Sequence, residues 1–321
     1  MNAHLWVDIA WIGVSIVLLW KGADGVVYAS ARIASRFGLS DVVIGMTVVA
    51  IGTSAPEMVV TLVAALRHQP EISVGNVVGS NIFNLGFILG GCAVLRTLPT
   101  SRSLVVRDAV MLLLSASLLA LFFVGDSKLT RMDGALMIAI LGAYVLYLFH
   151  RDEPLVDETE APDRPAETGP PDFWDAPLVL VSLAAVVGGA HLLVGSATEV
   201  ARTLGLSEWA IAMTIVAGGT SLPELATSVA AVLRGHPGLV AGNLIGSDLF
   251  NMLGVLGLAA LFHPLQIHST AMGSIVMMVA MVGLVALFMR TGWRLTRLEG
   301  AFLILLAILR WSRDLTPSLW S

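Results

Sequence analysis

The chain has 321 residues, of which 56% are hydrophobic and 13% are charged, and its formal net charge at pH 7 is −5. Soluble domains contain about 25% charged residues, so the composition excludes a water-soluble enzyme and a disordered chain. The single cysteine, Cys92, excludes an internal disulfide, and the negative charge excludes the basic surface typical of nucleic-acid-binding proteins. The class that remains is an all-α integral membrane protein.

Ten apolar segments follow one another along the chain, and each is about as long as the 20 residues that a helix needs to cross a bilayer. We expect transmembrane helices over residues 5–34, 42–66, 72–95, 104–124, 130–149, 177–201, 208–233, 239–262, 270–289 and 299–316. One long polar stretch, 151–176, separates the fifth segment from the sixth. It is rich in Asp, Glu and Pro, a composition typical of a flexible linker.

The two halves contain an internal repeat. Residues 46–84 align without a gap on residues 213–251, and 19 of the 39 positions are identical. Because each half has an odd number of spans, the second copy must cross the membrane in the opposite sense. Inverted repeats are an architecture of transporters, with the binding site near the middle of the membrane. The sequence predicts ten transmembrane helices as two inverted five-helix repeats, over 1–150 and 177–321.

The distribution of Lys and Arg among the loops predicts the orientation. If the N-terminus is outside, the cytoplasmic loops hold eleven of these residues and the outer loops hold six. Cytoplasmic loops are enriched in positive charge. We therefore expect a multi-pass protein of the inner or plasma membrane with both termini outside and the linker in the cytoplasm.

The motif Gly-Thr-Ser-x-Pro-Glu occurs once in each repeat, at 52–57 and at 219–224, inside a long apolar segment. Proline removes a hydrogen bond to the carbonyl four residues earlier, so we expect a broken helix with free carbonyls over 50–53 and 217–220. An ionised glutamate at this depth is costly unless it is compensated. We expect Glu57 and Glu224 to meet and bind cations. An ordinary kink and neutral packing glutamates are the alternatives, and the duplication disfavours both.

A second motif, Gly-Asn-x-x-Gly-Ser-Asn/Asp-x-Phe-Asn, follows at 75–84 and 242–251. Its polar side chains recur every four residues and so share one helix face: Asn76, Ser80 and Asn84 in the first repeat, and Asn243, Ser247 and Asn251 in the second. These side chains either join helices or bind the ion, and their position near two carboxylates favours ion binding.

The oxygen donors collected in these motifs predict the type of cation. Carboxylates, hydroxyls, amides and carbonyls are present, whereas thiolates and imidazoles are not. Hard oxygen ligands favour Ca²⁺, Mg²⁺ or Na⁺ over Zn²⁺ or Cu²⁺, and Mg²⁺ tends to keep its water. Two carboxylates are neutralised by one Ca²⁺ or by two Na⁺. The sequence therefore favours Ca²⁺ and Na⁺ competing for one site in a lipid bilayer, with no cofactor, nucleic acid or protein partner.

The paired motifs resemble the two alpha repeats of the cation/calcium exchanger superfamily, and the Gly-Thr-Ser-x-Pro-Glu form resembles its prokaryotic sodium/calcium exchanger branch. The resemblance implies alternating access, in which the first and sixth helices slide past a central core. It also implies a set of ion ligands: the carboxylates of Glu57 and Glu224, the hydroxyls of Ser54, Ser80, Ser221 and Ser247, the backbone near Ala50, Thr53, Ala217 and Thr220, and the amides of Asn84 and Asn251.

One position departs from part of that superfamily. Some relatives, potassium-dependent members among them, carry aspartate where this chain has Asn251, which disfavours potassium coupling. Asp248 is an additional acid that either faces the ion path or pairs at a helix interface. The predicted function is secondary active exchange of Ca²⁺ for Na⁺. Proton coupling in the same fold, a cation channel and an intramembrane enzyme are the alternatives.

Overall fold

The computed structural model describes residues 3–124, 128–150, 174–204, 217–266 and 272–315. The helices of the first half are α1 (Ala3–Phe37), α2 (Asp41–Ile44), α3 (Ala50–Thr53), α4 (Ala55–Leu66), α5 (Pro70–Phe83), α6 (Gly90–Leu95), α7 (Val110–Val124) and α8 (Arg131–His150). Those of the second half are α9 (Asp175–Thr203), α11 (Ala217–Gly219), α12 (Leu222–Arg234), α13 (Pro237–Leu249), α14 (Gly257–Phe262), α15 (Met272–Arg290) and α16 (Arg297–Leu315). Short π-helical segments continue several of them, namely η1 (Gly45–Val49), η2 (Asn84–Leu89), η3 (Leu104–Ala109) and η5 (Phe250–Leu256).

Among the described residues, seven helices are long and apolar enough to cross a membrane, and a bent pair brings the number to eight. The bent pair joins Asp41–Thr53 to Ala55–Leu66 at an angle of 51°. Large apolar side chains such as Leu121, Val124 and Leu180 are exposed on the long helices, as expected where a helix faces lipid. The chain is therefore a multi-pass helical membrane protein.

Two of the ten expected spans are not among these eight. The span expected over 208–233 falls partly outside the described residues, and its described part is α11 and α12. The span expected over 299–316 is present as α16, but charged residues such as Arg297, Glu299 and Arg310 shorten its apolar stretch. The linker expected over 151–176 lies mostly outside the described residues, and α9 begins at Asp175.

The two halves repeat the same order of elements. Helices α12, α13 and α14 each begin 167 residues after α4, α5 and α6. Strand β1 (Leu98–Pro99) pairs with β4 (Arg294–Leu295), and β2 (Lys128–Leu129) pairs with β3 (Leu265–Gln266), both antiparallel. Each pair contains one strand from each half, so exchanging the halves maps one pair onto the other.

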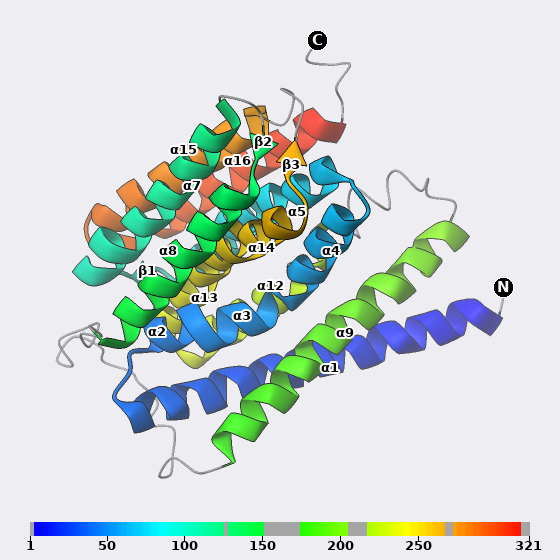
Figure 1. Cartoon of the computed structure of the whole chain (residues 1–321). Helices are drawn as coiled ribbons and strands as arrows, with labels where there is room; N and C mark the ends of the chain where they lie inside the picture. The colour runs from blue at the N-terminus through cyan, green and yellow to red at the C-terminus, as the bar shows by residue number, and fades with distance from the viewer. Residues whose placement is uncertain (1–2, 125–127, 151–173, 205–216, 267–271, 316–321) are drawn as a thin grey trace.

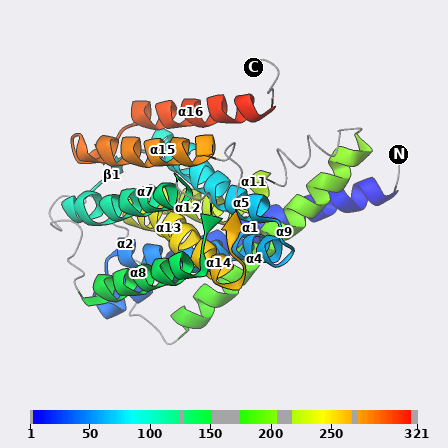
Figure 2. The same ribbon diagram turned by 45° about the horizontal axis from the view of Figure 1, so that its top comes forward.

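Helices α1 and α9 form a long pair that lies along one face of the other helices (Figure 1), and Figure 2 shows the same pair from a second direction. Their contact is close because both helices carry small residues there. A Cβ atom on Gly189 would lie 3.1 Å from the Ser15 carbonyl oxygen of α1. An ion pair between Arg32 Nε and Asp175 Oδ1, at 2.9 Å, joins the two helices.

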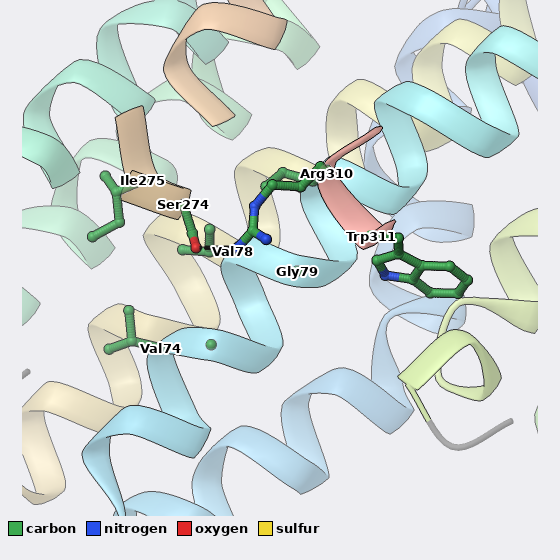
Figure 3. A pocket seen from close by; sticks show the side chains of 9 residues that line it. Val74, Val78, Gly79, Ser274, Ile275, Arg310 and Trp311 are labelled. Carbon is green, nitrogen blue, oxygen red and sulfur yellow. Dashed lines mark hydrogen bonds between the residues drawn. The ribbon is translucent and has the colours of Figure 1, made fainter. Parts of the chain in front are cut away.

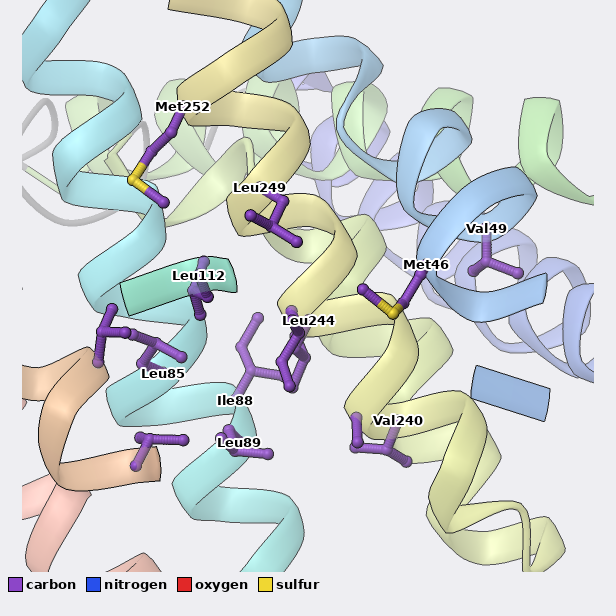
Figure 4. Packing of buried hydrophobic residues seen from close by; sticks show 14 of the residues in the cluster. Met46, Val49, Leu85, Ile88, Leu89, Leu112, Val240, Leu244, Leu249 and Met252 are labelled. Atoms are coloured by element: carbon purple, nitrogen blue, oxygen red, sulfur yellow. The ribbon is translucent and has the colours of Figure 1, made fainter. Parts of the chain in front are cut away.

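The apolar core surrounds α13 and fixes its position (Figure 4). Leu244, Leu249 and Met252 of the α13–η5 rod face Leu85 and Ile88 of η2 within one cluster of buried side chains. On another side, the backbone of α13 touches the backbone of the first broken helix: a Cβ atom on Gly246 would lie 2.5 Å from the Met46 Cα atom. Glycine therefore permits a helix contact that no other residue allows, and this contact places the polar stripe of α13 beside the helix break.

Candidate cation site

Each Gly-Thr-Ser-x-Pro-Glu motif lies at a helix break. Ser54 separates α3 from α4, and Thr220 and Ser221 separate α11 from α12. The proline stands in the first turn of the new helix, where its missing N–H group is not needed. Glu57 and Glu224 follow in the same turn. The positive end of each helix dipole therefore stabilises the carboxylate of its own motif.

The expected release of backbone carbonyls at Ala50 is wrong. The Ala50 carbonyl oxygen accepts a hydrogen bond from Ser54 N at 3.0 Å and another from Thr53 Oγ1 at 3.4 Å. The physical reason is that Pro56 removes only the donor to the residue four positions earlier, Gly52. Residue Ala217 lies at the start of α11.

The two glutamates are joined through the serines of the two motifs in the protein interior. Ser54 Oγ donates to Glu224 Oε1 at 2.9 Å, and Ser221 Oγ donates to Glu57 Oε1 at 3.0 Å. Each serine thus binds the glutamate of the other repeat. Both carboxylates are 0% exposed, and the second oxygen of each, Oε2, has no hydrogen-bond partner among the described residues.

The remaining hydroxyls of the predicted set are placed unequally. Ser247 Oγ lies 3.4 Å from Glu224 Oε1 and 3.5 Å from Thr53 Oγ1. Ser80 is also buried, but its hydroxyl donates to the Val77 carbonyl of its own helix at 3.1 Å. Thr220 is half-buried at the break before α12. Among the residues described, Ser247 therefore contacts a carboxylate in this conformation, whereas its counterpart in the first repeat, Ser80, does not.

Asn76 and Asn243 join helices, although the sequence favoured ion binding for both. Asn76 Nδ2 donates to Thr61 Oγ1 at 3.0 Å, and Asn243 Nδ2 donates to Ser228 Oγ at 3.1 Å. These bonds hold α5 against α4 and α13 against α12. The Asn243 oxygen accepts a bond from Thr53 Oγ1 at 3.2 Å, so this amide also connects the two halves.

Asn84 and Asn251 lie in π-helical segments, which are frequent at functional sites. Asn84 Nδ2 donates to Asp248 Oδ1 at 3.0 Å, and Asn251 Nδ2 donates to Asn81 Oδ1 at 3.4 Å. Asp248 is therefore part of the polar centre and pairs with an amide of the other repeat. Sequence reasoning left the placement of Asp248 open and did not single out Asn81. The alignment of position 81 on position 248 was the available signal.

Several buried side-chain oxygens at this centre accept no hydrogen bond. Five oxygens have no hydrogen-bond partner among the described residues: Glu57 Oε2, Glu224 Oε2, Asp248 Oδ2, Asn84 Oδ1 and Asn251 Oδ1. A buried acceptor left unsatisfied costs about 1–3 kcal/mol, and one cation satisfies several such oxygens at once. No group of three or more His, Cys, Asp or Glu side chains gathers to hold a metal in the described ranges. A mixed set of oxygens suits Ca²⁺ or Na⁺ better than Zn²⁺ or Cu²⁺.

A cavity of about 250 Å³ lies away from this centre, between α5, α15 and α16 (Figure 3). Val74, Gly79 and Ile275 line it, and Arg310 donates to Ser274 Oγ at its wall. None of its lining residues is acidic. The cavity is therefore separate from the carboxylate pair.

The reciprocal serine contacts predict equal effects of two substitutions. Ser54→Ala and Ser221→Ala should each weaken Ca²⁺ binding about tenfold, because each removes one hydrogen bond to a buried carboxylate, worth about 1.5 kcal/mol. Calorimetric titration of the purified variants measures the affinities. Ser115→Ala, which removes a buried hydroxyl bonded to the Met111 carbonyl of its own helix segment, should leave the affinity unchanged. A loss confined to one of the two site variants would contradict the reciprocal arrangement.

In a multi-pass membrane protein, buried carboxylates without a fixed counter-ion are suited to carry cations across the membrane. The fold and the carboxylate pair together therefore define a cation transporter. The sequence model of the family described as "Sodium/calcium exchanger protein" matches residues 7–150 and 174–310. The chain belongs to this family of antiporters, which exchange calcium for other cations and are not enzymes.

Individual relatives and solved structures agree with this membership. The chain is 39% identical over 306 residues to the provisionally assigned antiporter CaxA of Alkalimonas amylolytica, covering 91% of this chain and 93% of that protein. It is 32% identical to the sodium/calcium exchanger MaX1 of Methanosarcina acetivorans, over 90% of this chain and 93% of that protein. The solved structure of the sodium-calcium exchanger NCX_Mj, soaked with Na⁺ and Sr²⁺, superposes with a TM-score of 0.83 at 31% identity, covering 95% of this chain and 98% of that one.

Proposed function

We propose that this protein exchanges Ca²⁺ for Na⁺ across the cell membrane by alternating access, and that Glu57 and Glu224 form one cation site. The reciprocal bonds from Ser54 to Glu224 and from Ser221 to Glu57 carry this proposal. They join two carboxylates from different repeats into one pair with a formal charge of −2, which one Ca²⁺ or two Na⁺ neutralise. The names of MaX1 and NCX_Mj as sodium/calcium exchangers support the choice of ions.

The proposed ligands are oxygens of both repeats. They are the side chains of Glu57, Glu224, Ser54, Ser221, Ser80, Ser247, Asn84 and Asn251 and the backbone near Ala50, Ala217, Thr53 and Thr220. The Ala50 carbonyl oxygen can bind an ion only when it gives up the longer of its two hydrogen bonds, the one from Thr53 Oγ1 at 3.4 Å. Ser80 must turn from the Val77 carbonyl toward the ion when it binds. Ca²⁺ and Na⁺ are substrates in this scheme, and the site needs no resident cofactor.

The coupling follows from the cost of an empty site. Two ionised carboxylates without a cation in a medium of low dielectric constant repel each other and lose their hydration, each at a cost of several kcal/mol. Either Ca²⁺ or Na⁺ removes this cost. The protein therefore changes between its inward-open and outward-open states when it is loaded, which enforces exchange.

We further infer the membrane topology. Two observations support ten transmembrane helices in two inverted repeats, 1–150 and 177–321. Helices α12 to α14 follow α4 to α6 at a constant spacing, and each strand pair joins one strand of each half. The Lys and Arg distribution supports both termini outside and a cytoplasmic linker at 151–176. In this arrangement α1 and α9, which lie together along one face, are the helices that slide during alternating access.

Ca²⁺ uptake into proteoliposomes tests the proposed exchange. Vesicles loaded with Na⁺ are compared with vesicles loaded with K⁺ and with vesicles under an imposed pH gradient. Uptake that requires internal Na⁺ supports the proposal. Uptake driven by the pH gradient and indifferent to Na⁺ would assign the same site to proton coupling, since the unpartnered Oε2 atoms of the glutamates also accept protons. Flux that needs no counter-ion would indicate a channel.

A further inference from the structure

Two histidines from different halves of the chain meet where α4 and α14 end. His68 Nδ1 lies 3.1 Å from His263 Nε2, and the centroids of the two rings are 4.3 Å apart. His68 is exposed and His263 is half-buried, so a solute can reach the pair. Glu57 stands in the first turn of α4, a helix of 12 residues, and His68 follows the last turn. About 18 Å of helix therefore separates the histidine pair from the carboxylate site.

The backbone of His68 has a conformation that favours glycine. Its φ angle is 58°, in the left-handed region where a Cβ atom causes strain. The equivalent position in the other repeat, 167 residues later, is Gly235, whose φ angle is 79°. The second repeat thus makes the same turn with the residue that avoids the strain. The first repeat retains an imidazole there at a local cost, which indicates a role for the side chain itself.

A hydrogen bond between the two rings does not explain the pair. Water competes with a bond between exposed groups, so its net contribution to stability is small. The equivalent of His263 in the first half is Arg96, and the two residues have matching backbone angles, φ −142° and ψ 123° against φ −148° and ψ 130°. The fold therefore forms both turns with Gly235 and Arg96 in these places and requires no ring pair.

The spacing of the ring nitrogens suits two ligands of one metal ion. Zinc lies about 2.0–2.1 Å from a histidine nitrogen, so two such nitrogens are about 2.9–3.4 Å apart at ligand angles of roughly 90–110°. The observed distance of 3.1 Å between His68 Nδ1 and His263 Nε2 lies in this range. Imidazole nitrogens bind Zn²⁺, Ni²⁺ and Cu²⁺, whereas Ca²⁺ prefers oxygen ligands. The pair therefore differs in chemistry from the carboxylate site.

We propose that His68 and His263 bind one divalent transition-metal ion, such as Zn²⁺, and that the bound ion joins α4 of the first half to α14 of the second. Each residue is anchored at the end of its helix: His68 N donates to the Ala65 carbonyl at 3.1 Å, and His263 N donates to the Ala259 carbonyl at 2.9 Å. Within the described ranges, no third His, Cys, Asp or Glu completes the group. Water therefore fills the remaining coordination positions. This site goes beyond the proposed exchange and does not depend on it.

Zinc binding to His68→Gly tests the site. The purified protein, without a histidine tag, is titrated with Zn²⁺ in a calorimeter with Ca²⁺ in excess, so that the carboxylate site is occupied. The wild type should bind one Zn²⁺ per chain. His68→Gly and His263→Ala should each bind it at least about tenfold more weakly, a loss that even an indirect partner of a metal ligand causes.

His150→Gln is the matched control for these variants. It removes an exposed histidine whose Nδ1 lies 2.8 Å from the Leu146 carbonyl of its own helix, and it should bind Zn²⁺ as the wild type does. Equal zinc affinity in the wild type and His68→Gly would overturn the inference, and so would a wild type that binds no Zn²⁺.

Thermal unfolding separates a metal site from a packing role of the ring. In EDTA, His68→Gly should be as stable as the wild type or slightly more stable, because glycine relieves the strain at this φ angle. Zn²⁺ should raise the Tm of the wild type, since a ligand stabilises the state that binds it, and it should not raise the Tm of His68→Gly. A variant that is less stable in EDTA and is stabilised by Zn²⁺ as much as the wild type would assign the ring to packing and refute the metal site.

Discussion

Glu57→Gln and Glu224→Gln will each reduce Na⁺-driven Ca²⁺ uptake by at least about 100-fold, because removing one partner of a buried charged assembly costs about 3–5 kcal/mol. Glutamine has the size of glutamate and still accepts the hydrogen bond that Ser221 or Ser54 donates. The packing of the centre is therefore retained, and the change measured is the loss of charge. Initial rates of uptake into Na⁺-loaded proteoliposomes give the effect.

Glu71→Gln is the matched control for these two variants. Glu71 lies in the first turn of α5 and is exposed, so its substitution should leave uptake within about twofold of the wild-type rate, as is usual for surface positions. A site made by both glutamates predicts that neither site variant keeps partial activity. Half of the wild-type rate in either variant would mean that each glutamate acts in a separate site.

Gly246→Ala will destabilise the protein and abolish transport. A Cβ atom at this position would lie 2.5 Å from Met46 Cα and 2.8 Å from the Met46 carbonyl oxygen. Both are backbone atoms, so no side chain can rotate away, and α13 must move away from η1. Overpacking of this kind costs about 1–3 kcal/mol. The displacement also moves Ser247, the next residue, away from Glu224. We expect a Tm lower by about 3–10 °C, measured by thermal unfolding in detergent.

Gly91→Ala provides the comparison for that substitution. Gly91 lies within α6, and no described atom lies within 4 Å of the position that its Cβ atom would occupy. Alanine has a higher helix propensity than glycine by about 1 kcal/mol, so this variant should be as stable as the wild type or slightly more stable. If Gly246→Ala unfolds at the same temperature as Gly91→Ala, the close contact between α13 and η1 is not tight in solution.

The sequence predicts the main helices and the pairing of the two motifs well. The span expected at 104–124 coincides with η3 and α7 together, and the break expected near Pro56 lies at Ser54. A long continuous apolar segment in a bilayer forms a helix, because a helix satisfies all of its backbone hydrogen bonds within the segment. The main helices are therefore predictable. The internal repeat explains the site, because each half contributes one copy of the motif and the serine of each copy bonds to the glutamate of the other.

The contacts within the centre are less predictable, because a sequence pattern gives the face of a helix and not its neighbour. The stripe of Asn76, Ser80 and Asn84 looks uniform, yet Asn76 bonds to α4 and Ser80 bonds to its own helix, whereas Asn84 bonds to Asp248. Which of these side chains meets the other repeat depends on where η2 crosses α13. That crossing depends on the buried apolar cluster that contains Leu85, Ile88 and Leu244, whose side chains lie outside the polar stripe.

Glu57 and Glu224 are proposed to form a single cation site shared by the two repeats. Equilibrium binding of radioactive Ca²⁺ to the purified protein in Na⁺-free detergent solution tests it directly. We expect one Ca²⁺ bound per chain, its release by added Na⁺, and complete loss of binding in both Glu57→Gln and Glu224→Gln. Two Ca²⁺ per chain in the wild type, with one retained in each variant, would contradict it.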